Sequence, residues 1–417
     1  MGHHVDPKMV FEESRHLGAG AKKLMLIAAV LGLALVLAGL GLAMGSEGGV
    51  KHFYFSYLIG YGLILSLSLG GLFFVLIHHV TKAGWSVVVR RVAEMMAGNF
   101  PLLAILSLPI VVPALLGNNI LYRWADQEAL HAAHDNLTLM KVGYLNGGFF
   151  VLRIALYFAV WIFLSRLFVG SSVKQDADGA RAMTAKMEKW SAPGLILFAL
   201  TTTFAAFDLF MTLDPHWFST IFGVYYFGGS VLAFFAFMIL ALLIIQKLGL
   251  LTHMVSREHY HDLGKYLFAF TFFWSYIAFS QYMLIWYGDI PEETGWFLRR
   301  QTHGWEIVSL VLVFGHFLIP MLGLVSRHVK RNRATLAFWA VWSIVMHWVD
   351  LYWLIVPEMA DHSATTHAHW HFAPFEALIP LGMLGIFIAG FVWNGLSVSL
   401  VPERDPRLGE SLAFHNF

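Results

Sequence analysis

Long apolar runs alternate with short polar segments along the chain. Each run is long enough to cross the hydrocarbon core of a bilayer, for which a helix needs about 20 residues. A transmembrane β-barrel would instead show segments of about 10 residues with alternating polarity. The pattern therefore predicts an all-α integral membrane protein with ten transmembrane helices, over Leu24–Met44, Tyr54–Ile77, Leu102–Leu121, Val142–Phe168, Pro193–Leu213, Ile221–Ile245, Leu263–Tyr287, Trp305–Val325, Thr335–Val356 and Phe375–Ser399.

Basic residues divide unevenly between the polar segments. The termini and the connections between predicted helices 2–3, 4–5, 6–7 and 8–9 carry 21 lysines and arginines, and the remaining connections carry five. Cytoplasmic segments are the ones enriched in these residues. We therefore expect both termini in the cytoplasm. On the same side, Gly84–Ala97, with Arg90, Arg91 and Glu94, has the pattern of an interfacial amphipathic helix.

The fifth and ninth predicted helices end in similar sequences. Asp208 stands in Phe-Asp-Leu-Phe, seven residues before Pro215. Asp350 stands in Val-Asp-Leu-Tyr, seven residues before Pro357. A parallel repeat with an offset of four helices would give two four-helix bundles, helices 2–5 and 6–9, with helices 1 and 10 flanking them; chance matching of aromatic-rich helices is the alternative. The corresponding boundaries are 1–53, 54–219, 220–374 and 375–417.

Composition narrows the range of partners and cofactors. Charged residues make up 13% of the chain, against about 25% in soluble domains. The net charge of +1 gives no reason to expect nucleic acid as a partner, whereas membrane lipid is expected. Cysteine is absent, which excludes disulfides, iron–sulfur clusters held by this chain and covalent c-type haem. We expect no cofactor of this chain's own and no catalytic residue, and quinone binding is left open.

Five ionisable residues stand out in the interior of predicted helices, where Asp, Arg or Lys at a helix centre costs at least about 2.5–3.5 kcal/mol. Arg153 lies near the middle of the fourth helix, and Asp208 lies in the fifth, within reach of a long side chain. His316 lies in the eighth helix at the depth of Arg153. His347 and Asp350 lie one turn apart on the ninth. Because imidazole titrates near neutral pH, we interpret these residues as a proton relay.

Other interpretations of the same residues stay open. Arg153 and Asp208 would also serve as a structural ion pair between two helices. The histidines would also serve as hydrogen-bonded residues that join helices. His316 and His347 together would also supply the two axial ligands of a b-type haem.

Polar residues near the far side of the membrane are candidates for the mouth of a pathway. Gln281 and Tyr276 lie on the seventh helix, Asp289 follows it and Glu306 begins the eighth. Interfacial solvation is the alternative for each of them alone. The loop over 362–371 contains an alternating His-x-His-x-His, which binds transition metals in some proteins and is otherwise a neutral polar loop, so we assign no metal ligand.

Three sequence blocks resemble a known family. They are Leu213-Asp214-Pro215-His216-Trp217-Phe218-Ser219-Thr220-Ile221-Phe222-Gly223, Ile285-Trp286-Tyr287-Gly288-Asp289-Ile290-Pro291-Glu292-Glu293, and Trp348-Val349-Asp350-Leu351-Tyr352-Trp353-Leu354. Together they resemble the NrfD/PsrC-like membrane subunits of bacterial alternative complex III, the quinol:cytochrome c oxidoreductase. Of the two such subunits, ActC and ActF, the Asp-Pro-His-Trp junction is more similar to ActF.

The resemblance implies a location, partners and a role. It implies the bacterial inner membrane and a complex with a second NrfD-like subunit. It also implies partner subunits that carry iron–sulfur clusters and c-type haems, with the quinol site in the sister subunit. This chain would then provide a proton pathway or conformational coupling. A secondary transporter remains an alternative, since Pro109, Pro113 and Pro320 permit broken helices, as does a structural anchor.

Overall fold

The computed structural model describes residues 15–46, 48–360 and 370–416. No strand occurs in these ranges, and ten helical segments are long and apolar enough to cross a membrane, which confirms the predicted fold class. The segments are α2 (Gly20–Met44), α3 (Gly49–Val80), the consecutive α4 (Val87–Ala97), α5 (Phe100–Leu106) and α6 (Leu108–Leu115), α9 (Gly147–Asp178), α10 (Arg181–Leu209), α11 (Phe222–Lys247), α12 (Arg257–Gly288), α14 (Trp305–Val311) with η3 (Leu312–Leu318) and α15 (Ile319–Val325), α17 (Arg333–Ile355) and α18 (Phe375–Gly395).

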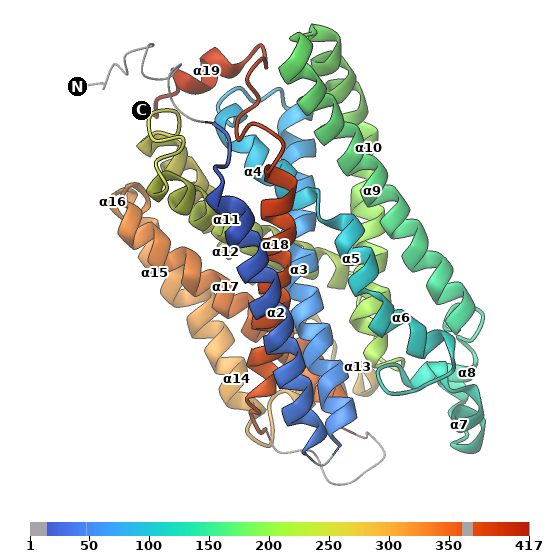
Figure 1. Cartoon of the computed structure of the whole chain (residues 1–417). Coiled ribbons are helices and arrows are strands. Elements are labelled where there is room, and N and C mark those ends of the chain that lie inside the picture. The colour runs from blue at the N-terminus through green and yellow to red at the C-terminus, as the bar shows by residue number, and fades with distance from the viewer. Residues whose placement is uncertain (1–14, 47, 361–369, 417) are drawn as a thin grey trace.

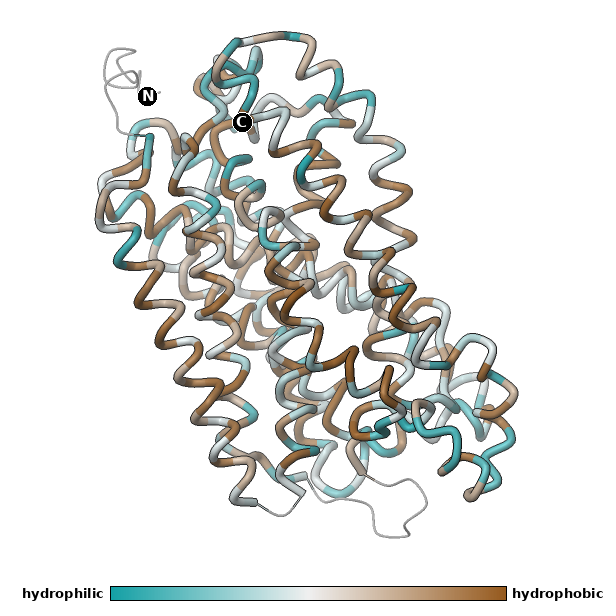
Figure 2. The backbone as a smooth tube through the Cα atoms, turned by 45° about the vertical axis from the view of Figure 1, so that its right-hand side comes forward, coloured by the Kyte–Doolittle hydropathy of each residue, from teal (hydrophilic) through white to brown (hydrophobic). Residues whose placement is uncertain are grey.

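The beginning of α2 and the short C-terminal helix α19 (Leu408–Leu412) lie at the same end of the bundle, which we call the terminal end (Figure 1). The other end, the opposite end, holds the short helices α7 (Gln127–Ala132), α8 (Asn136–Leu139) and α13 (Pro291–Arg299). Figure 2 shows hydrophobic residues along the middle of the helices and hydrophilic residues gathered towards the two ends. This distribution is what a bilayer requires of a membrane-spanning bundle.

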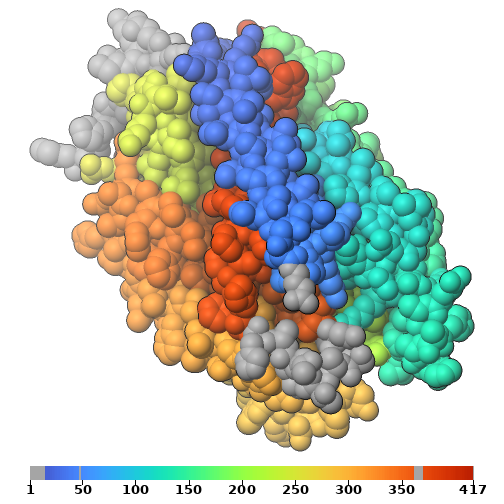
Figure 3. All heavy atoms as spheres, turned by 60° about the horizontal axis from the view of Figure 1, so that its bottom comes forward, coloured from blue at the N-terminus to red at the C-terminus, as the bar shows by residue number. Residues whose placement is uncertain are grey.

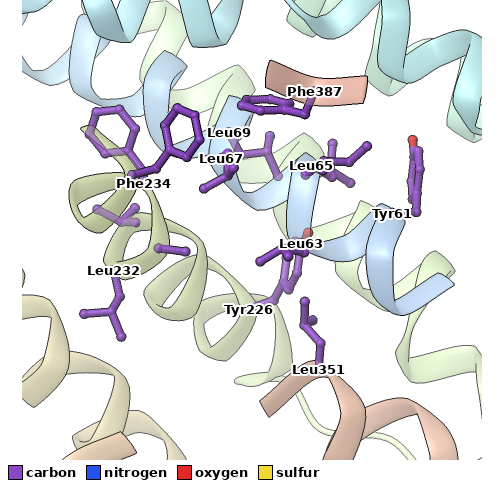
Figure 4. Close-up of a cluster of buried hydrophobic side chains, with 14 of the residues drawn as sticks. Tyr61, Leu63, Leu65, Leu67, Leu69, Tyr226, Leu232, Phe234, Leu351 and Phe387 are labelled. Carbon is purple, nitrogen blue, oxygen red and sulfur yellow. The ribbon is translucent and has the colours of Figure 1, made fainter. Parts of the chain in front are cut away.

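The centre of the molecule is the contact between α3 and α11. Both helices are buried over most of their length. Besides α11, α3 packs against α4, α10, α17 and α18. Figure 4 shows the leucines and aromatic rings that fill this contact. A Cβ atom on Gly70 of α3 would lie 2.2 Å from the Cβ of Phe234 on α11, so only glycine permits this approach.

The first and last transmembrane helices pair with each other, although they lie far apart in the sequence. α2 and α18 run side by side, and α18 also packs on α3 (Figure 1). A Cβ atom on Gly32 would lie 2.7 Å from the carbonyl oxygen of Gly382. The division of the remaining helices into two repeated bundles stays a prediction.

The third transmembrane segment differs from the predicted single helix over Leu102–Leu121. It consists of α4, α5 and α6, and it includes the region predicted as an interfacial helix. That prediction is wrong, because all eleven residues of α4 are buried. The helix is amphipathic, but its polar face packs against other parts of the chain. Arg90 donates to Asp405 of the C-terminal segment, and Arg91 donates to Asp176 of α9.

Side chains of neighbouring helices satisfy carbonyl groups around the breaks in this segment. Unpaired backbone groups inside a bilayer cost several kcal/mol, so a broken helix needs such partners. Four hydroxyl groups donate to its carbonyls: Ser68 to Met96, Ser165 to Ala97, Tyr61 to Leu103 and Tyr57 to Leu106.

Candidate functional site

The first cluster of buried charges joins α9 to α10. Arg153 Nε and Nη2 donate to the two carboxylate oxygens of Asp208, each over 2.8 Å. The Asp208 side chain is fully buried. α9 begins only at Gly147, so Arg153 lies in its second turn, towards the opposite end, and the predicted position near the middle of the helix is wrong. The two charges neutralise each other in a bidentate pair, which fixes both side chains.

Two tyrosines that the sequence analysis did not single out complete this cluster. Tyr157 donates to Asp208 over 2.7 Å. The centroid of the Tyr144 ring lies 3.8 Å from the Arg153 guanidinium carbon. The backbone carbonyl oxygen of Tyr144 accepts from Arg153 Nη1 over 2.8 Å. Burial and the neighbouring Asp208 carboxylate raise the pKa of Tyr144 to about 12, so its phenol is neutral at physiological pH. Arg153 and Tyr157 thus direct their donors at acceptors within the cluster.

The second cluster surrounds Asp350 of α17, which is 1% exposed. Tyr225 of α11 donates to its Oδ1, and Trp274 of α12 donates to its Oδ2 over 3.1 Å. Among the described residues, no lysine or arginine forms an ion pair with Asp350. Its titratable neighbour is His347, whose Nδ1 lies 3.9 Å from Oδ2. Asp350 thus has hydrogen-bond donors but no fixed cation.

A series of polar groups leads from His347 into the α3–α11 contact, whereas the 3.9 Å between His347 Nδ1 and Asp350 is longer than a hydrogen bond. His347 Nε2 lies 3.0 Å from Ser66 Oγ on α3. Ser66 Oγ in turn lies 3.2 Å from the Tyr226 hydroxyl and 3.1 Å from Ser230 Oγ, both on α11. Figure 4 shows Tyr226 pointing from α11 towards α3, among leucines. The groups are close enough to form a hydrogen-bonded chain inside an otherwise apolar contact.

His316 lies beside this chain without joining it. It is part of η3, a π-helical turn, and its ring stacks on Trp274 with 3.9 Å between centroids and 12° between planes. Neither ring nitrogen has a hydrogen-bond partner among the described residues. π-Helical turns are frequent at functional sites. The Trp274 indole therefore lies between His316 and Asp350. Arg153, which was predicted at the same depth as His316, instead contacts Asp208 directly.

The predicted mouth residues do not gather at one place. Gln281 is buried and lies 3.2 Å from Ser219 Oγ, in the segment before α11. Tyr276 is 60% exposed on the outside of α12. Asp289 is exposed directly after α12, and Glu306 is exposed in the first turn of α14. No hydrogen bond or ion pair links these four side chains to Asp350 within the described ranges.

The histidine-rich loop is described only in part. His362, His367 and His369 lie outside the described residues. His371 is exposed, and its carbonyl oxygen accepts from Tyr352 over 3.4 Å. The described part of the chain contains no group of three or more histidine, aspartate or glutamate side chains arranged to hold a metal ion.

Sequence reasoning also missed an ion-pair cluster at the opposite end, the end that Figure 3 shows in space-filling form. Arg300 is fully buried, stacks on Trp296 with 3.3 Å to the ring centroid, and donates to Glu358 over 2.9 Å. Burial lowers the pKa of Arg300 to about 10, so its guanidinium stays charged at neutral pH. Arg299 donates to Asp214 and Glu358. The cluster joins α13 and the segment after α10 to the end of α17, eight residues beyond Asp350.

No protein-family model matches the chain, and no curated protein matches it either.

Proposed function

We propose that this chain is a membrane subunit of a respiratory quinol:electron-acceptor oxidoreductase of the alternative complex III type. It would lie in the bacterial inner membrane with both termini cytoplasmic. Its partners would be a second NrfD-like subunit and subunits with iron–sulfur clusters and c-type haems. The resemblance of three sequence blocks, the ten-helix fold and the absence of cysteine support this proposal.

The first and third blocks pack on either side of a tryptophan that follows the second block in the sequence. Trp217 of the first block stacks on Trp296, three residues after the second, with 4.3 Å between centroids. Trp296 packs edge-on against Trp353 of the third block, with 5.3 Å between centroids. Arg299 and Arg300 tie the same segments together through ion pairs.

Within such a complex, the role that the geometry supports best is proton transfer at Asp350. The observation that carries this proposal is that Asp350 is buried, hydrogen-bonded and without a lysine or arginine partner among the described residues, while Asp208 is paired with Arg153. An unpaired carboxylate in a bilayer is costly, and a proton is the ion that can neutralise it here. His347 is the nearest imidazole, with Nδ1 3.9 Å from the carboxylate, and its Nε2 lies 3.0 Å from Ser66 Oγ.

Identification of the co-purifying proteins tests the assignment to a complex. We expect the tagged chain, extracted in mild detergent, to carry haem absorbance and subunits with cysteine-ligated clusters. A chain that purifies alone or as a homo-oligomer, without either redox centre, would contradict the proposal.

The broken third segment favours a secondary transporter as the second candidate, because transporters bind substrates at discontinuous helices. In this chain, however, hydroxyl groups of neighbouring helices already occupy the carbonyls of Met96, Ala97, Leu103 and Leu106. Those carbonyls therefore serve packing. A transporter would bind or exchange a solute in proteoliposomes without any redox partner, which separates the two candidates.

A further inference from the structure

A cationic hollow of about 630 Å³ lies at the terminal end. It is formed where α12 begins, at the short helix α16 (Arg327–Arg331), and where α17 begins. Its lining consists of Arg257, His328, Arg331, Asn332 and Arg333. The volume falls in the range of small-ligand sites, about 300–1,000 Å³. None of its residues belongs to either buried cluster described above.

The cations of this hollow are only partly neutralised within the chain. Arg331 forms an ion pair with Glu258. Arg333 lies 5.5 Å from the centroid of the Tyr260 ring. The Arg257 side chain is exposed and makes no hydrogen bond or ion pair with any other described residue. The lining residues carry three guanidinium groups and no carboxylate, which favours an anionic ligand. Guanidinium groups match phosphate oxygens in charge and in bidentate geometry.

Exposed apolar side chains lie on both helices that adjoin the hollow. On α15, Leu322 is 68% and Val325 62% exposed, and on α17 Phe338 is 55% exposed. A soluble anion would use the guanidinium groups alone, whereas a phospholipid would use the guanidinium groups for its headgroup and the apolar surface for its acyl chains.

We propose that this hollow binds the phosphate headgroup of an anionic phospholipid, with the acyl chains along the outer surface of α15 and α17. Basic pockets between transmembrane helices on the cytoplasmic side recognise such headgroups in other membrane proteins. The proposal rests on the proposed orientation, which places the terminal end at the anionic leaflet. It does not depend on electron or proton transfer, so either proposal can fail without the other.

Native mass spectrometry in detergent, with added phosphatidylglycerol, measures lipid binding to the full chain and the subunits that co-purify with it. The test variant is Arg257→Gln with Arg333→Gln. The matched control is Arg181→Gln with Lys189→Gln, which removes two exposed cations from the same end of the bundle, outside the hollow. We expect the test variant to bind phosphatidylglycerol about 30-fold more weakly, the factor for two surface charges at about 1 kcal/mol each.

A single substitution guards against misfolding. Arg257→Gln alone removes a side chain without an ion pair among the described residues, and we expect about fivefold weaker binding. Its thermal unfolding temperature should equal that of the wild type. Equal loss of binding in the control variant, or no loss in the test variant, would overturn the proposal.

Two further ligands identify the source of the phosphate. Phosphatidylcholine should bind weakly and should be insensitive to the substitutions, because its headgroup carries no net charge. Pyrophosphate at millimolar concentration should not displace phosphatidylglycerol. Binding of pyrophosphate as tightly as the lipid, with the same dependence on Arg257 and Arg333, would identify a site for soluble anions and overturn the lipid assignment.

Discussion

At the scale of single residues, two buried aspartates differ in what balances their charge. Asp208 accepts two hydrogen bonds from the Arg153 guanidinium and one from Tyr157. Asp350 accepts hydrogen bonds from Tyr225 and Trp274, which are neutral groups. The first arrangement is a fixed ion pair that joins two helices, and it favours the structural interpretation of Arg153. The second leaves a carboxylate that is hydrogen-bonded but not ion-paired with a lysine or arginine of the described residues.

Removal of the arginine tests the structural role. We expect Arg153→Met to lower the free energy of unfolding by about 3–5 kcal/mol, because Asp208 then keeps an uncompensated buried charge. Arg153→Met combined with Asp208→Leu should recover most of that loss, since apolar pairs often replace buried ion pairs at little cost. Thermal unfolding in detergent, followed by tryptophan fluorescence, measures both. A single variant as stable as the wild type would refute the structural role.

The sequence was sufficient to locate both aspartates, because a carboxylate stands out within an apolar run. It was not sufficient to find Tyr225 or Trp274. The chain has 14 tyrosines and 15 tryptophans, and which of them meets an aspartate depends on how each helix is rotated. For the same reason, depth alone did not reveal that Trp274 lies between His316 and Asp350.

At the scale of elements, the third transmembrane segment shows how a broken helix is accommodated. The helix is interrupted at Gly98-Asn99 and again at Ser107. Pro101 and Pro109 lie at the start of the helices that follow, because proline lacks a hydrogen-bond donor and is favoured in the first turn of a helix. The sequence analysis predicted a single helix over Leu102–Leu121, with Pro109 only permitting a break, and it did not predict the burial of α4. That burial requires the C-terminal segment, whose Asp405 reaches Arg90 across more than 300 residues.

Loss of one interhelical hydroxyl should weaken this segment. We expect Ser165→Ala to destabilise the protein by about 0.6 kcal/mol, and by no more than about 2, because the carbonyl of Ala97 loses its partner. Loss of this hydrogen bond should appear as faster amide hydrogen exchange around residues 97–103. Thr81→Ala is the control, because the exposed Thr81 hydroxyl bonds only to a carbonyl of its own helix. Equal exchange rates in both variants would contradict this account of the break.

At the scale of the whole molecule, the helix count was predictable and the helix arrangement was not. Ten apolar runs exceed the length of a bilayer core, so their number follows from the sequence. The pairing of α2 with α18 joins the two ends of the chain through close contact at Gly32 and Gly382. Many glycines occur in these helices, and only the packed structure distinguishes those that permit contact from those that face outward.

Two glycines of the same helix test that distinction. We expect Gly32→Leu to cost about 1–3 kcal/mol, because the added side chain has no room against α18. Gly41→Leu should be nearly neutral, since a Cβ at Gly41 has no other atom within 4 Å and the residue is exposed. Thermal unfolding temperatures compare the two variants. Equal loss of stability would show that the α2–α18 contact does not hold α2 in place.

The most direct test of the proposed role is proton movement in membrane vesicles that contain the assembled complex with Asp350→Asn. Glu128→Gln, an exposed carboxylate at the opposite end, serves as the control. We predict that Asp350→Asn assembles with wild-type subunit content and loses quinol-driven proton movement, while Glu128→Gln retains it. Unchanged proton movement in an intact Asp350→Asn complex would contradict the assignment of Asp350 as the proton-carrying group.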